Sequence, residues 1–72
     1  MMRNIHFITV TGTVELIQNG DRDWSFHIKQ DGLTFVLEKV SLRQGDVVQV
    51  VGQVVQIDGH SLTVLVERLE IL

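Results

Sequence analysis

The stretch NIHFITVTGTVELIQ, residues 4–18, decides the fold. Its side chains alternate in character, with Ile8, Val10, Val14 and Leu16 on one parity and Thr9, Thr11, Thr13 and Glu15 on the other. This alternation predicts a β-strand with one buried face. The strand would be long, and Gly12 at its centre lacks the Cβ that opposes a sharp bend. A long strand that bends at a glycine can serve two halves of a closed barrel.

Four turn signals divide the remaining chain and predict five strands in all. They are Asn19-Gly20-Asp21, Asp31-Gly32, Gln44-Gly45-Asp46 and Asp58-Gly59. Asn, Asp and Gly tolerate the positive φ that tight turns require. The segments between them are rich in Val, Ile, Thr and Phe, and the chain has no proline. We therefore expect strands at residues 4–18, 24–30, 33–40, 46–57 and 61–69 and no competing helix.

The second and third strands flank Asp31-Gly32, which is a strong signal for a two-residue hairpin. Such a loop fixes the register. It places Ile28 opposite Phe35 and Phe26 opposite Leu37 on a core face, and Lys29 opposite Thr34, His27 opposite Val36 and Ser25 opposite Glu38 on a solvated face.

The fourth and fifth strands need a β-bulge, because a simple register would put Gln53 on the side of Val64. One extra residue at Gly52 shifts the parity. The shift brings Val48, Val50, Val55, Leu62, Val64 and Val66 into one interior. Residues 41–44, between the third and fourth strands, are too few for more than one helical turn.

Length and composition indicate one small soluble domain spanning residues 1–72. The chain is 44% hydrophobic and 21% charged, a balance typical of globular proteins. It has no cysteine for disulfides, no signal-peptide pattern and no apolar run near the ~20 residues of a membrane span. We expect no membrane association and a cytoplasmic location. The net charge of −3 argues against strong, indiscriminate phosphate binding.

These patterns resemble the OB-fold, in particular its compact anticodon-binding-like and single-stranded-DNA-binding-like members. The resemblance covers nearly the whole chain and rests on VTGTV at residues 10–14, on the Asp31-Gly32 hairpin and on GDVVQVVGQV at residues 45–54. It implies an all-β, five-stranded OB-fold-like Greek-key barrel, here with little or no helix between strands three and four. SH3-like barrels are the structural alternative, although they typically lack so long a glycine-bent first strand.

The resemblance also implies a binding site for single-stranded nucleic acid across the second and third strands and the adjoining loops. The residues at those positions are Arg22, Trp24, Ser25, His27, Lys29, Thr34 and His60. Arg22 and Lys29 would meet phosphates, and Trp24 or His27 would stack on a base. Two plainer readings stand beside this one. Trp24 shares the parity of Phe26 and is expected to cap the core, and His27 and Lys29 suit any solvated face.

Neither metal binding nor catalysis is expected. His6, His27 and His60 fall on separate strands without close spacing, and a zinc site needs three or four convergent ligands. The sequence has no cysteine nucleophile, phosphate-binding glycine loop or His-Glu-x-x-His motif. We expect a binding module without cofactors.

Protein–protein assembly is the rival function, because many apolar side chains fall on the outward parity. They include Ile5, Phe7 and Val40, with Val36, Val47, Val51 and Leu65 as the expected interface of an oligomer. The segment RLEIL, residues 68–72, continues the alternation and would extend a sheet across a subunit boundary. The plainer reading is that some of these residues cover the open ends of the barrel.

Overall fold

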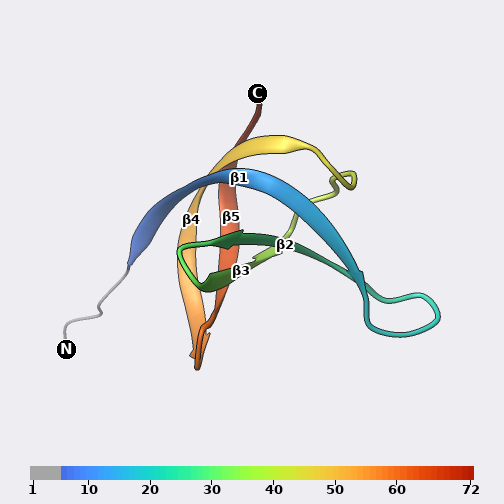
Figure 1. The fold of residues 1–72 in the computed structure, drawn as a ribbon. Coiled ribbons are helices and arrows are strands. Elements are labelled where there is room, and N and C mark those ends of the chain that lie inside the picture. Colours follow the sequence, from blue (N-terminus) through green and yellow to red (C-terminus); the bar gives the residue numbers. More distant parts are fainter. Residues whose placement is uncertain (1–5) are drawn as a thin grey trace.

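In the computed structural model, which describes residues 6–72, five strands account for nearly all of the described chain (Figure 1). They are β1 (Phe7–Gln18), β2 (Trp24–Gln30), β3 (Leu33–Glu38), β4 (Val47–Asp58) and β5 (Ser61–Ile71). The expected first-strand residues Asn4 and Ile5 lie outside the described part. No helix interrupts residues 6–72, so the β3–β4 connection is irregular, as predicted.

The strands close into a barrel in the order β1-β2-β3-β5-β4, with β4 returning to β1. β3 and β5 pair in parallel, and every other pair is antiparallel. The predicted class, an all-β five-stranded barrel of OB-fold-like form, is confirmed.

β1 contributes to both sides of the barrel, as its sequence predicts. Residues 7–13 pair with β4, and residues 14–18 pair with β2. A Cβ on Gly12 would lie 2.6 Å from Cγ2 of the fully buried Ile28. Gly12 therefore allows β2 to pack closely across the bend of β1.

The β2–β3 hairpin has the predicted register. Ile28 pairs with Phe35, Phe26 with Leu37, Lys29 with Thr34 and His27 with Val36, whereas Ser25 and Glu38 lie beyond the paired residues. Asp31 and Gly32 have φ values of 54° and 78°. Positive φ at both central residues is the requirement of a type I′ turn, whose twist suits a hairpin.

β4 and β5 contain two bulges where one was predicted. The register shifts between Val51 and Gly52, as expected, but the extra residue is Glu67 of β5. A second shift leaves Val55 of β4 unpaired. The prediction that Val55 joins the core is wrong, because the inserted side chain is 50% exposed.

The core lies between the inner faces of all five strands and includes one residue from a loop. Its buried members are Val10, Val14, Ile28, Phe35, Leu37, Leu42, Val48, Val50 and Val64. Leu42 comes from the β3–β4 connection and was not predicted. It covers the end of the barrel where a helix would otherwise pack. β3 stops at Glu38 rather than Val40, because Lys39 takes a φ of 68° that turns the chain out of the sheet.

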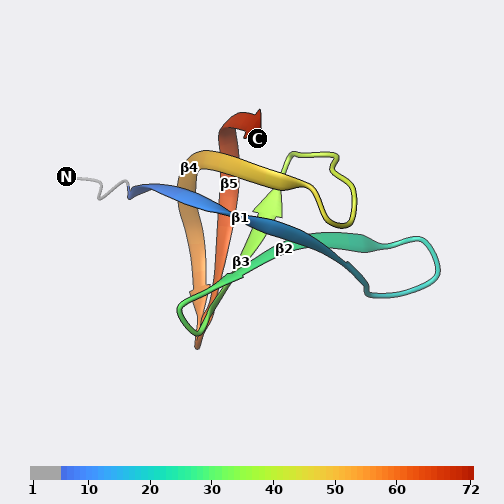
Figure 2. The same cartoon turned by 45° about the horizontal axis from the view of Figure 1, so that its top comes forward.

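The predicted core position of Trp24 is also wrong, because its side chain is 49% exposed. The β2–β3 ladder begins only at Phe26, so Trp24 is accompanied by Gln18 of β1 alone. The end of β1 and the start of β2 form a two-stranded arm that leaves the barrel (Figures 1 and 2). Trp24 points to the same side of β2 as Phe26 and Ile28, but at its position no strand packs over that side.

Candidate nucleic-acid interface

Four of the predicted site residues share the outer face of the β2–β3 hairpin. Ser25, His27 and Lys29 alternate along β2, and Thr34 lies opposite Lys29 on β3. His27 pairs with Glu15 of β1 on one side and with Val36 of β3 on the other. The structure thus forms a shallow polar strip with Val36 as its apolar member.

Lys29 is not free on this strip, because its Nζ lies 3.6 Å from Oε2 of Glu15. Both side chains are exposed to solvent, so the pair contributes little to stability. It does reduce the positive potential that Lys29 offers to a phosphate. Sequence reasoning missed this contact, although Glu15 falls on the solvated parity of its strand.

Acidic residues outnumber basic ones from β1 to Lys39, the segment that carries the strip. The cations there are Arg22, Lys29 and Lys39, and the acids are Glu15, Asp21, Asp23, Asp31 and Glu38. A ligand here gains little from long-range attraction and must depend on stacking and hydrogen bonding.

The imidazole of His27 is partly buried between its cross-strand neighbours. Burial lowers its pKa below the usual 6.5, and the charge of Lys29 lowers it further, while Glu15 acts in the opposite direction. The ring is therefore predominantly neutral at pH 7, a form that can stack on a base and both donate and accept a hydrogen bond.

Local hydrogen bonds hold the β1–β2 loop that carries Arg22 and leads into Trp24. The amide of Asn19 donates to the carbonyl of Asp23 over 2.8 Å, and Nε2 of Gln18 donates to the carbonyl of Gly20 over 2.9 Å. Nδ2 of Asn19 also donates to Oγ of Ser25. These contacts tie the loop to the first residues of β2 and so hold the tip of the arm.

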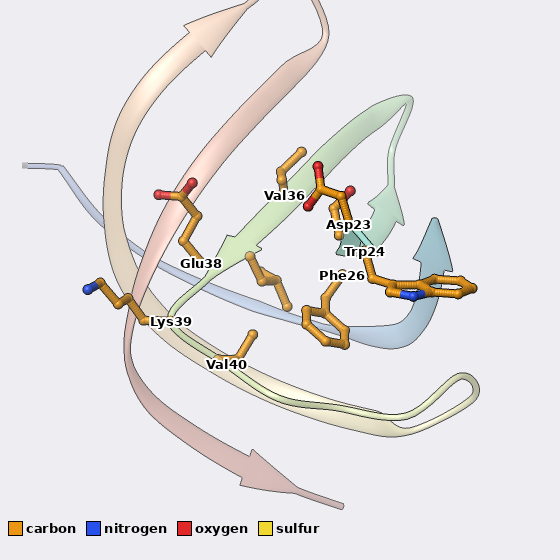
Figure 3. A pocket seen from close by; sticks show the side chains of 9 residues that line it. Asp23, Trp24, Phe26, Val36, Glu38, Lys39 and Val40 are labelled. Atoms are coloured by element: carbon orange, nitrogen blue, oxygen red, sulfur yellow. The ribbon is translucent and has the colours of Figure 1, made fainter. Parts of the chain in front are cut away.

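A hollow of about 410 Å³ opens beside Trp24, lined by residues 23–26 and 36–40. Figure 3 shows the indole at one side, Glu38 and Lys39 at the other, and Phe26 and Val40 between them. The hollow has an apolar floor and a charged rim. It adjoins the polar strip through Ser25 and Val36.

His60 lies at the opposite end of the hairpin from Trp24. Its carbonyl accepts a hydrogen bond of 2.8 Å from the amide of Thr34, which joins the β4–β5 turn to the start of β3. The predicted site residues therefore run along the hairpin from Arg22 and Trp24 near one end to His60 near the other. Trp24 has the opposite facing on β2 from Ser25, His27 and Lys29.

The residues of the alternative interface lie on β3, β4 and β5. Val36 lies in the polar strip, Leu65 pairs with Glu38 and Gln53, and Val51 pairs with Thr9 and Arg68, all three being half-buried. Val47 is exposed at the start of β4. These three strands are neighbours in the barrel, in the order β3-β5-β4.

Within residues 6–72, no three His, Asp or Glu side chains come together as metal ligands, and no helix of membrane-spanning length and hydropathy occurs. Comparisons with models of protein families, with curated proteins and with solved structures give no match to the chain.

Proposed function

We propose that this domain is a non-catalytic binding module that takes a single strand of nucleic acid along the outer face of β2 and β3. The observation that carries the proposal is the exposed indole of Trp24, which borders a hollow that is also lined by Ser25 and Val36 of the polar strip. Burial of a tryptophan is strongly favourable, so one that is 49% exposed beside a hollow offers a ready stacking surface.

The strip supplies what a nucleotide chain needs after a first base has stacked on Trp24. Neutral His27 offers a second ring, and the hydroxyls of Ser25 and Thr34 offer hydrogen bonds to base edges or sugars. Arg22 and Lys29 are the available phosphate contacts, although Lys29 first has to leave Glu15. We expect weak binding with a shallow dependence on salt.

Intrinsic fluorescence tests this proposal, because Trp24 is the single tryptophan of the chain. Titration with oligonucleotides of about 10 nucleotides at low salt should quench the emission, since OB domains occupy about 4–16 nucleotides and stacking alters the environment of the indole. Duplex DNA of the same sequence is the control and should quench less. Unchanged emission and no binding by a label-based assay at low salt would remove the proposal.

Two substitutions separate stacking from charge. Trp24→Ala should weaken binding about 5- to 150-fold, the equivalent of about 1–3 kcal/mol per stacked base, whereas Trp24→Phe should retain much of it. Glu15→Gln frees Lys29, so affinity should rise and the salt slope should steepen by about 0.7 for one added phosphate contact. Glu67→Gln, which removes the same charge on β5, is the matched control and should change neither quantity.

Two further parts of the proposal concern the superfamily and the location. Its strand order, the bent β1 and the parallel β3–β5 pair fit membership of the OB-fold superfamily. The absence of cysteine fits a cytoplasmic location.

Assembly with other protein chains is a second candidate function. The observation that favours it is the set of exposed apolar side chains outside the β2–β3 hairpin. They all belong to β1, β4, β5 and the residue after it: Phe7, Val47, Val55, Ile57, Leu69, Ile71 and Leu72. If these side chains form contacts between chains, the mass in solution will be at least twice 8.2 kDa. If the outward faces of the strands form the contact, Val51→Lys or Leu65→Lys will dissociate it. A monomer at all concentrations by light scattering would remove this candidate.

A further inference from the structure

The C-terminal half of β5 has an open edge. β3 pairs with residues 61–65 of β5 only, whereas β4 pairs with β5 as far as Ile71. Figure 2 shows the end of β5 beyond the tip of β3. No other described segment donates or accepts a backbone hydrogen bond along this edge after Leu65. Open edges of this kind are templates for a further strand.

The direction of the backbone groups on this edge follows from one hydrogen bond. The amide of Leu72 donates to the carbonyl of Val47 over 2.8 Å, so the polar groups of Leu72 face β4. In an antiparallel ladder, successive residues direct their N–H and C=O groups to opposite sides. The groups of Leu69 and Ile71 therefore point away from β4 to the open edge.

The charges on this half-strand are self-complementary. Arg68 and Glu70, the residues before and after Leu69, have side chains on the outer face of β5. Neither forms an ion pair with another residue of the described chain. A second copy placed antiparallel about a two-fold axis at Leu69 brings Arg68 of each chain opposite Glu70 of the other. Moving the axis by one residue to Arg68 or Glu70 instead puts like charges directly opposite, which is destabilising.

We propose that two copies of this chain pair antiparallel through their β5 edges, with Leu69 opposite Leu69 at the two-fold axis. Leu69 then forms the hydrogen-bonded pair, for which its outward N–H and C=O groups are already oriented. Arg68 and Glu70 fall in the adjacent positions, where cross-strand side chains approach most closely.

Pairing also covers apolar surface that the single chain leaves open. Leu69, Ile71 and Leu72 are 38%, 62% and 64% exposed, respectively. Because the contact is isologous, it uses both edges and stops at a dimer. This inference rests on the assembly candidate and commits it to the edge of β5; the oligonucleotide proposal concerns β2 and β3 and is independent of it.

Charge reversal and its compensation form the test. Sedimentation equilibrium of the full chain, over a micromolar to millimolar series, should show a monomer–dimer equilibrium. Arg68→Glu or Glu70→Arg places like charges opposite each other twice and should raise the dissociation constant at least about tenfold. The double variant Arg68→Glu/Glu70→Arg restores the opposite-charge pairs and should restore the dimer.

Arg22→Glu makes the same charge change on the β1–β2 loop and should leave the dimer intact. Circular dichroism of every variant verifies that the barrel is folded. A monomeric wild type overturns both the edge pairing and the assembly candidate. A dimer that Arg68→Glu leaves intact but Val51→Lys dissociates overturns the edge pairing and retains assembly through the strand faces. Failure of the double variant to restore the dimer also overturns the pairing.

Discussion

Gly52 is the position where one methyl group should disturb this barrel most. A Cβ built on Gly52 lies 2.5 Å from the carbonyl oxygen of Leu65 and 2.7 Å from Cγ1 of Val64. Both distances are well inside ordinary van der Waals contact, which for a Cβ begins at 3.4 Å. The first obstacle is backbone next to a β-bulge, so no rotamer change relieves it. β5 must move away from β4, or β4 must bend.

The cost of Gly52→Ala can be set from these contacts. Overpacking a core costs about 1–3 kcal/mol, and the backbone obstacle places this case at about 3. The reduced entropy of the unfolded chain returns about 0.4–1 kcal/mol. The expected loss is about 2 kcal/mol, which corresponds to about 8–16 °C in Tm for a domain of this size.

Two other glycines give the comparison. Gly12→Ala meets only Ile28, a side chain, at 2.6 Å and should be destabilising by a smaller amount. Gly20→Ala meets no heavy atom within 4 Å and should remain within about 0.5 kcal/mol of the wild type. Urea unfolding followed by circular dichroism gives the three free energies. If Gly52→Ala unfolds at the same urea concentration as Gly20→Ala, the close approach of β5 to Gly52 is wrong.

Two further predictions concern the backbone of Lys39 and the titration of His27. Lys39→Gly should stabilise the domain by up to about 1 kcal/mol, because relief of the left-handed φ of 68° outweighs the added freedom of the unfolded chain; a lower Tm would contradict this. The lowered pKa of His27 means that the unfolded chain binds its proton more tightly than the folded chain. Stability should therefore decrease as pH falls from above 6.5 through the folded-state pKa, and His27→Gln should flatten the profile of unfolding free energy between pH 7.5 and 5. An unchanged profile would show that His27 is not responsible.

The parts of the fold that the sequence predicts depend on local geometry. The Asp31-Gly32 turn sets the register of a two-residue hairpin, and a strand with glycine at its centre bends there. A parity conflict between two strands requires a bulge, which is why a register shift at Gly52 is predictable. The parity argument cannot tell which strand carries the extra residue, and it gives no sign of a second shift at Val55.

The errors arise where burial depends on how far the neighbouring strands extend, which the alternation of side chains along one strand does not show. Trp24 has the correct alternation for burial, but β3 ends before it reaches that level, and no sequence pattern reports where a neighbouring strand stops. Leu42 occupies a loop, where periodicity carries no information. The same limit applies to the candidate site. Alternation places Ser25, His27 and Lys29 on one face, but the Glu15–Lys29 contact depends on the β1–β2 register, which the five-residue loop does not determine.

The closed barrel buries its apolar side chains, whereas the β1–β2 arm and the end of β5 leave some of theirs exposed. Among the described residues, no buried side-chain nitrogen or oxygen lacks a hydrogen-bond partner, and the buried apolar residues form one cluster. Beyond the barrel, the β1–β2 arm exposes Trp24, and the end of β5 exposes Leu69 and Ile71. The arm is a two-stranded segment, which is marginally stable alone in water, whereas the end of β5 is the open edge of three paired strands. Exposed apolar side chains at both places gain free energy when another surface covers them. Both proposals therefore fall on the extensions: a base that stacks on Trp24, and a second strand that pairs with β5, would each complete a part of the molecule that the barrel leaves open.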